Sequence, residues 1–180
     1  LPDADKPYKV TIVARGQTGG HTRYLPEEDR HMWTKKQFKD MLAAAMGGRA
    51  AEELVFNEVT TGAGNDLEQA TNIARTMVTR YGMSEKLGPR TFGKREELVF
   101  LGREISEQRD YSDRVAQTID EEVHDLIEGA HQSAATVIKE HMAKLTQLSK
   151  YLIDHETVEG DVLDNLWSGP STEPDPMPAG

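Results

Sequence analysis

The sequence contains no cysteine among its 180 residues. Disulfides and thiolate metal sites are therefore excluded, and a transition-metal site has to be built from histidine, aspartate and glutamate. The sequence also lacks any apolar run near the roughly 20 residues that cross a bilayer. No basic segment followed by an apolar one resembles a signal peptide. We therefore expect this chain to be soluble and to make no membrane contact by itself.

Positive charge is scarce. Lysine and arginine number 21 against 31 aspartates and glutamates, which gives a formal net charge of -10 at pH 7. No block of basic residues is present that would neutralise a row of phosphates or bind an anionic surface. The composition therefore argues against nucleic acid as a partner.

The pattern of apolar residues predicts a mainly α domain with one small hairpin or sheet near the N-terminus. Lys9 to Ala14 is rich in β-branched residues and precedes several glycines, which is typical of a strand and a turn, and 21–25 is a candidate return strand. The first strand either pairs with an extended peptide as an exposed edge or belongs to an ordinary structural hairpin, and we favour the hairpin.

Capping and periodicity predict the first helices. Thr34 and Gln37 form a capping-box signature at the start of a helix. If this helix continues through Gly47 and Gly48, the glycines are costly, and close helix packing is the favoured explanation. A further amphipathic helix from Leu67 ends near Gly82.

The C-terminal half predicts a long helix pair. Ser112 caps a helix whose apolar stripe runs to Ile138, and a second helix continues it. Residues 84–110 are interpreted as a long connection or mobile flap. We expect one short closing helix over 157–167, a domain over 1–167 and a disordered proline-rich tail over 168–180.

The loop from Thr60 to Asp66 is rich in glycine, but it lacks the Gly-Lys-Ser/Thr of a phosphate-binding loop, so nucleotide binding is rejected there. Asp66 falls in the first turn of the following helix, where the helix dipole stabilises a carboxylate. Such a residue is most often a plain cap. The spacing alone does not indicate a metal site.

None of the six histidines has the i, i+4 spacing of two zinc ligands on one helix face. The segment from His155 to Glu159 begins like a zinc-protease helix but ends in glutamate and crosses a predicted helix break. The remaining histidines are interpreted as surface residues: His21, His31, His124, His131 and His141.

Five blocks in a fixed order resemble the FtsH family of membrane-bound ATP-dependent zinc metalloproteases. The resemblance covers about 1–166 and corresponds to the C-terminal part of the family's peptidase domain. It implies that this piece is mainly helical. The blocks are Lys9–Gly16, Leu25–Asp29, Gly47–Phe56, Thr60–Leu67 and Met77–Pro89.

The resemblance implies roles for particular residues. It makes Asp66 the third protein ligand of a catalytic zinc, beside two histidines and a water. It places Glu52 close to the metal, where it would orient a ligand histidine; an ordinary salt bridge on a helix is the open alternative. It also implies a strand that holds the substrate backbone in extended form, made of Lys9, Val10, Thr11, Ile12, Val13 and Ala14.

The His-Glu-x-x-His helix of the family is absent from this sequence, so no catalytic residue is assigned here. Peptide hydrolysis of this kind needs a zinc-bound water and a glutamate base. We therefore expect the chain alone neither to retain zinc nor to cleave peptides. The alternatives are a catalytically dead family member that acts as an assembly scaffold and, more remotely, an unrelated helical interaction module with Val115 to Ile138 as its partner surface.

For the parent protein the resemblance implies a homo-hexamer that uses ATP and magnesium through an ATPase module. It further implies a membrane anchor, with the peptidase domain in the cytoplasm or an organelle equivalent. Its substrates would be polypeptides, both membrane proteins and unfolded or regulatory soluble proteins, as in protein quality control.

Overall fold

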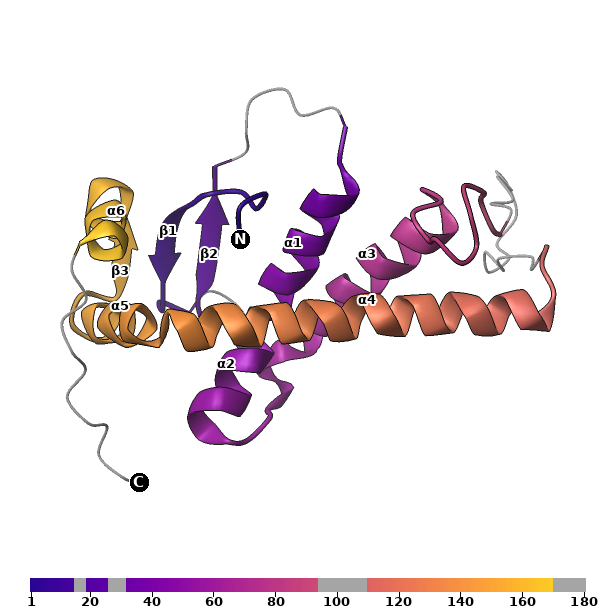
Figure 1. Cartoon of the computed structure of the whole chain (residues 1–180). Helices are drawn as coiled ribbons and strands as arrows, with labels where there is room; N and C mark the ends of the chain where they lie inside the picture. The colour runs from indigo at the N-terminus through magenta and orange to yellow at the C-terminus, as the bar shows by residue number, and fades with distance from the viewer. Residues whose placement is uncertain (15–18, 26–31, 94–109, 170–180) are drawn as a thin grey trace, which may run out of the picture. The chain divides into compact units, whose positions relative to one another are not determined.

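The computed structural model describes residues 1–14, 19–25, 32–93 and 110–169 (Figure 1). The chain divides into two compact units. The helical unit comprises residues 1–2 and 33–135, and the sheet unit comprises residues 3–32 and 136–180. The predicted fold class is confirmed, because helices dominate and the strands form a single small sheet.

The helical unit begins as its capping signature predicts. Helix α1 (Lys35–Ala45) is capped by Thr34, whose hydroxyl accepts a hydrogen bond from the Gln37 backbone N–H at 3.2 Å. The Gln37 side chain accepts one from the Thr34 N–H at 2.9 Å. Two N–H groups that the helix leaves unpaired are thus satisfied by adjacent residues.

The glycine pair marks a break between two helices. Met46, at φ -76° and ψ -7°, ends α1 and precedes α2 (Gly47–Phe56). Our expectation of close helix packing at the glycines is wrong: among the described residues, a Cβ added to Gly47 would meet nothing within 4 Å. A Cβ added to Gly48 would meet only the Asp66 carboxylate, at 3.9 Å.

A short 3-10 turn, η1 (Thr61–Ala63), leads into α3 (Gly64–Thr79), and α4 (Asp113–Glu140) supplies the longest helix. Helix α3 packs against α1, and buried alanines on α3 and α4 alternate with larger apolar residues in the core. The side chains that form this core are more than nine-tenths buried: Leu42, Ala43, Met46, Ala50, Ala63, Ala70, Ala74, Met77, Val78, Phe92, Ile119, Val123, Ala130 and Ala134.

The segment after α3 is held against α4. Helix α3 ends at Thr79, three residues before the predicted Gly82, which has φ +59° in the turn that follows. The Ser84 hydroxyl donates a hydrogen bond to Glu122 at 2.7 Å, and Lys86 Nζ lies 3.0 Å from Glu122 and 3.1 Å from Asp125. The predicted long connection or flap is therefore fixed over its first residues, and 94–109 lie outside the described part of the chain.

The sheet unit contains three antiparallel strands in the order β2-β1-β3. They are β1 (Pro7–Thr11), β2 (His21–Tyr24) and β3 (Thr157–Glu159). Lys9 is opposite Arg23 on one side and Glu159 on the other. The return strand and the favoured hairpin are therefore confirmed, and the alternative of an exposed edge does not hold for β1, since it is the central strand.

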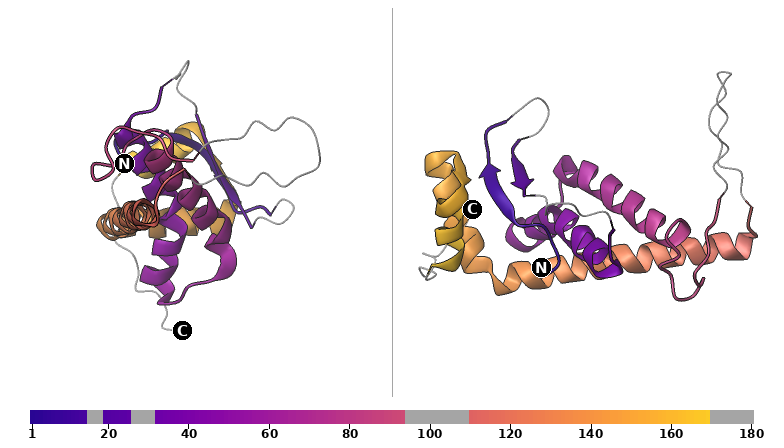
Figure 2. Two further views of the ribbon diagram at one scale, coloured as in Figure 1. Left: turned by 90° about the vertical axis from the view of Figure 1, so that its right-hand side faces the viewer. Right: turned by 90° about the horizontal axis from the view of Figure 1, so that it is seen from above.

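The C-terminal elements build the other layer of the sheet unit. Helix α5 (Met142–His155) follows α4 as the predicted long helix pair, and α6 (Gly160–Ser168) contacts β1 and β3 (Figures 1 and 2). The predicted helix over 157–167 is correct only from Gly160, because Thr157–Glu159 pair with β1. A core cluster joins these elements through Leu152, Val158 and Leu163.

Within the described residues, no helix combines the length and the apolar composition that a membrane crossing requires. The proline-rich segment 170–180, for which we predicted disorder, lies outside the described part of the chain.

Candidate metal-ligand site

Asp66 lies in the first turn of α3, as the sequence predicts, and its side chain is half-buried. The backbone N–H groups of this turn have no partner within the helix, and the positive end of the helix dipole lies here. An acidic side chain therefore suits this position.

The carboxylate does not cap its helix. The N-cap of α3 is Ala63, and no side chain makes a capping hydrogen bond there. Within the described residues Asp66 takes part in no hydrogen bond or ion pair. Since a buried or half-buried carboxylate normally has a partner, both of its oxygens remain available to a further one.

The break between α1 and α2 leaves space beside this carboxylate. Gly48 of α2 lies close to it, since a Cβ added there would lie 3.9 Å from Asp66 Oδ2. Because glycine has no side chain, nothing at this position covers that oxygen. At 3.9 Å an added Cβ would only touch the carboxylate, so this contact does not by itself require glycine.

Glu52 holds the loop that leads to Asp66. Its Oε2 accepts a hydrogen bond from the Thr60 backbone N–H at 3.0 Å, and its Oε1 accepts one from the Thr60 hydroxyl at 2.8 Å. Thr60 Oγ1 in turn accepts from the Gly62 N–H at 3.1 Å. Helix α2 is thereby fixed to Thr60, the N-cap of η1, four residues before α3 begins.

These bonds also set the charge state of Glu52. The Thr60 backbone N–H and hydroxyl, helped by the nearby Arg49 guanidinium, lower the pKa of the Glu52 carboxyl below its usual value. Within the described part of the chain Glu52 forms no ion pair, so the alternative of a salt bridge is not what the structure shows. Its role in orienting a histidine stays a prediction.

The neighbouring Glu53 makes a contact that sequence reasoning missed. Its carboxylate lies 3.0 Å from Arg49 Nε and 2.9 Å from His131 Nε2 on α4. The interpretation of His131 as a plain surface residue is wrong, because this nitrogen is buried. The Arg49–Glu53 pair could be read from its i, i+4 spacing, but the pairing with α4 could not.

The other histidines that the structure describes are not grouped as metal ligands. The His155 ring stacks on Tyr151 with centroids 4.1 Å apart, and α5 ends at His155, which confirms the predicted helix break. His31 lies outside the described residues. In the part of the chain that the structure describes, no three histidine, aspartate or glutamate side chains are grouped to hold a metal ion. Asp66 fits a zinc ligand in type, but tetrahedral zinc needs further ligands.

The predicted substrate strand is only partly available to a peptide. Lys9, Val10 and Thr11 are paired on both sides within the sheet. The Ile12 N–H donates to the Glu156 carbonyl at 3.0 Å. A substrate backbone therefore cannot add to this stretch without displacing β2 or β3, and the outer positions of the sheet belong to those two strands.

Comparison with known proteins finds one matching family model, described as Peptidase family M41, over residues 1–166. The chain is 58% identical over 174 residues to the ATP-dependent zinc metalloprotease FtsH 1 of Sphaerobacter thermophilus, covering 97% of this chain and 27% of that protein. It is 57% identical over 175 residues to FtsH 1 of Thermomicrobium roseum, with the same coverage of each chain. The chain thus spans about a quarter of the length of these relatives.

Proposed function

Because the chain belongs to peptidase family M41, we propose that it is the C-terminal part of the zinc peptidase domain of an ATP-dependent metalloendopeptidase. The observation that carries this proposal is the Asp66 carboxylate. It lies in the first turn of α3, beside Gly48, and has no protein partner in the described part of the chain. A carboxylate without a protein partner is suited to bind a cation.

Asp66 would hold the zinc as its third protein ligand, with two histidines and the general-base glutamate supplied by a His-Glu-x-x-His helix elsewhere in the parent polypeptide. When bound, zinc acidifies a water molecule and polarises the scissile carbonyl. Glu52 would keep the loop before α3 in place through Thr60, so that the Asp66 carboxylate stays where the ligand set needs it.

The zinc content of the purified chain tests part of this proposal. One carboxylate does not retain zinc against water, so we expect well under one zinc per chain and no peptide hydrolysis from the untagged 180 residues. The parent protein is expected to contain about one zinc per chain and to lose it on Asp66→Ala substitution. Zinc near one per chain in the isolated 180 residues would contradict the prediction that this part of the protein does not retain zinc by itself.

The order of the strands in the sheet leads us to propose a different strand for substrate binding. Since β1 is central, an extended polypeptide would add to the outer edge of β2. Arg23 and Glu159 flank Lys9 from opposite sides and so form a matched pair of test positions. A photo-cross-linker at Arg23 of the parent protease is expected to capture a bound peptide, whereas one at Glu159 is not. Equal capture at both positions would rule out a specific edge.

For the whole protein we propose, by similarity, a membrane-anchored homo-hexamer with its peptidase domain in the cytoplasm or an organelle equivalent. It would use ATP and magnesium to feed membrane proteins and unfolded or regulatory soluble proteins to this site, as in protein quality control. Native mass measurement of the whole protein in detergent tests the hexamer.

A catalytically dead relative that serves as an assembly scaffold is the second candidate. The unpartnered Asp66 carboxylate opposes it, because a scaffold has no use for a metal ligand. Reading the parent gene for about fifteen codons upstream of Leu1 decides between the two. A His-Glu-x-x-His sequence there supports the protease, and its absence removes the zinc assignment.

A further inference from the structure

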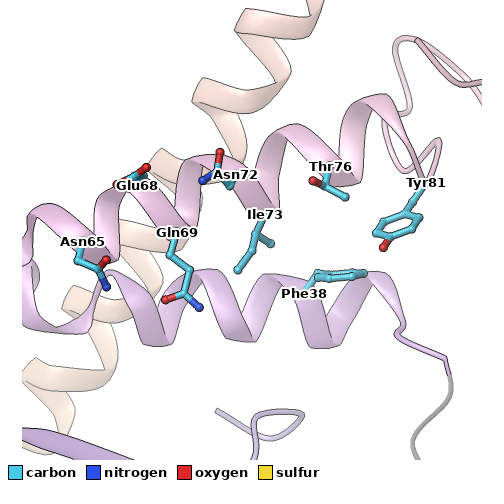
Figure 3. A pocket seen from close by; sticks show the side chains of 8 residues that line it. All are labelled: Phe38, Asn65, Glu68, Gln69, Asn72, Ile73, Thr76 and Tyr81. Carbon is cyan, nitrogen blue, oxygen red and sulfur yellow. The ribbon is translucent and has the colours of Figure 1, made fainter. Parts of the chain in front are cut away.

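The helical unit has a hollow of about 490 Å³ along the exposed face of α3, with α1 on its other side (Figure 3). Four uncharged polar side chains line it along the helix: Asn65, Gln69, Asn72 and Thr76. The first of them is adjacent in sequence to Asp66. Asn65 therefore marks the end of the hollow that is nearest in sequence to the proposed zinc ligand, and the hollow runs from there along the helix.

The spacing of these four residues, at i, i+4, i+7 and i+11, places them in one line on a helix. At 1.5 Å of rise per residue, the line from Asn65 to Thr76 is about 16 Å long. An extended peptide rises about 3.3 Å per residue, so the line matches about five residues of such a chain.

The chemistry of the line also suits a peptide backbone. A carboxamide offers two donors and one acceptor, and an extended backbone presents N–H and C=O groups in alternation. Within the described residues, the side chains of Asn65, Gln69 and Asn72 make no hydrogen bond. Glu68 is the only charged residue of the lining. The line therefore suits a neutral backbone better than a phosphate or a metal ion.

The far end of the hollow is aromatic. The rings of Phe38 and Tyr81 stack with centroids 5.5 Å apart, and the Trp33 ring lies 6.0 Å from Phe38. Tyr81 remains 55% exposed although its ring is largely apolar. Figure 3 shows Ile73 and Phe38 facing each other from α3 and α1 beside this ring. An apolar side chain placed here would cover the aromatic surface.

We propose that this hollow along α3, called the groove below, is a binding subsite for the polypeptide substrate. It would hold about five extended residues beyond the cleaved bond through hydrogen bonds from the carboxamides. An apolar side chain of the peptide would occupy the end at Phe38 and Tyr81. This inference rests on the proposed peptidase function, since it takes the bound polypeptide to be the substrate that Asp66 serves.

The double variant Gln69→Ala, Asn72→Ala tests the groove. Alanine is the best helix former, so α3 is expected to stay folded. The parent protease, freed of zinc by a chelator so that it cannot cut, is mixed with a labelled dodecapeptide carrying one leucine near each end. Fluorescence anisotropy is expected to show about tenfold weaker binding by the variant, since each lost hydrogen-bonding side chain contributes about a few-fold in affinity. Gln117→Ala, Gln132→Ala on α4 removes two exposed carboxamides outside the groove and should leave the affinity unchanged.

Hydrolysis by the zinc-loaded protease supplies the second arm. A tetrapeptide that spans only the cleaved bond is compared with the dodecapeptide that contains it. We expect Gln69→Ala, Asn72→Ala to raise KM about tenfold for the dodecapeptide, with kcat unchanged and the tetrapeptide unaffected. If the unmodified protease cuts neither peptide, the proposed peptidase function is wrong. The anisotropy measurement then still tests whether the groove binds a peptide.

Three results would overturn the subsite. One is equal dodecapeptide affinity of the variant and the unmodified protein, or no binding by either. Another is an equal rise of KM for both peptides, which would mean that the variant disturbs the metal site. The third is a changed oligomer size with unchanged peptide affinity, which would make the groove a contact between copies of the chain.

Discussion

Replacing Asp66 by asparagine separates a metal ligand from a structural cap. The carboxylate makes no hydrogen bond or ion pair in the described part of the chain, so the metal-free protein loses only its interaction with the dipole of α3. That interaction is worth about 0.3 to 1 kcal/mol at an exposed or half-buried position. For a chain of this length, 1 kcal/mol corresponds to a shift in Tm of about 2 to 4 °C.

The assay is thermal unfolding of the metal-free 180-residue chain, followed by circular dichroism. We expect Asp66→Asn to lower Tm by no more than about 4 °C. Asp113→Asn is the matched control, because Asp113 is the acidic residue in the first turn of α4 and removes the same charge from the same kind of position. The two variants should behave alike in the absence of metal.

The two variants should differ when they are made in the parent protease. Asp66→Asn is expected to remove zinc binding and peptide hydrolysis, whereas Asp113→Asn retains both. If Asp66→Asn instead destabilised the metal-free chain by more than about 2 kcal/mol, beyond the range of a dipole interaction, its carboxylate would be a structural group. The argument from its missing partners would then be refuted.

Three further predictions concern the helical unit. Leu42 is fully buried, so Leu42→Ala should cost about 3 to 5 kcal/mol of unfolding free energy in urea denaturation. The lowered pKa of Glu52 means that its bonds to Thr60 stabilise the fold fully above about pH 4.5 and are lost as the pH falls through the lowered pKa; Thr60→Val should therefore flatten the acid side of the stability curve. Hydrogen bonds to Glu122 and then Asp125 raise the pKa of Lys86, so this contribution is present below about pH 10.5 and lost as the pH rises through the raised value; Lys86→Met should flatten the alkaline side.

Local signals in the sequence located the elements around the site well. The capping box at Thr34 and the first-turn position of Asp66 depend on residues within one helical turn, so the pattern contains all the information they need. The end of α3 near Gly82 is of the same kind, since the positive φ of this residue suits glycine.

Pairings between distant residues could not be predicted in this way. The second pairing of Lys9 was missed because its partner, Glu159, comes from a segment that resembles the start of a helix. Thr157 and Val158 read equally well as strand or helix over so short a stretch, and tertiary pairing with β1 decides between them. The contact of His131 with Glu53 could not be predicted for the same reason, since it joins two helices that are far apart in the sequence.

Two adjacent glutamates on α2 hold different elements around the site in place. Successive residues of a helix point about 100° apart, so Glu52 and Glu53 reach different elements, although both carboxylates lie near Arg49. Glu52 binds Thr60 in the loop before Asp66, and Glu53 lies against His131 of α4. The short helix α2 therefore connects the ligand loop to the longest helix of the unit. Shortening Glu52 should loosen the loop and leave α4 in place, whereas shortening Glu53 should detach α2 from α4 and displace the loop with it.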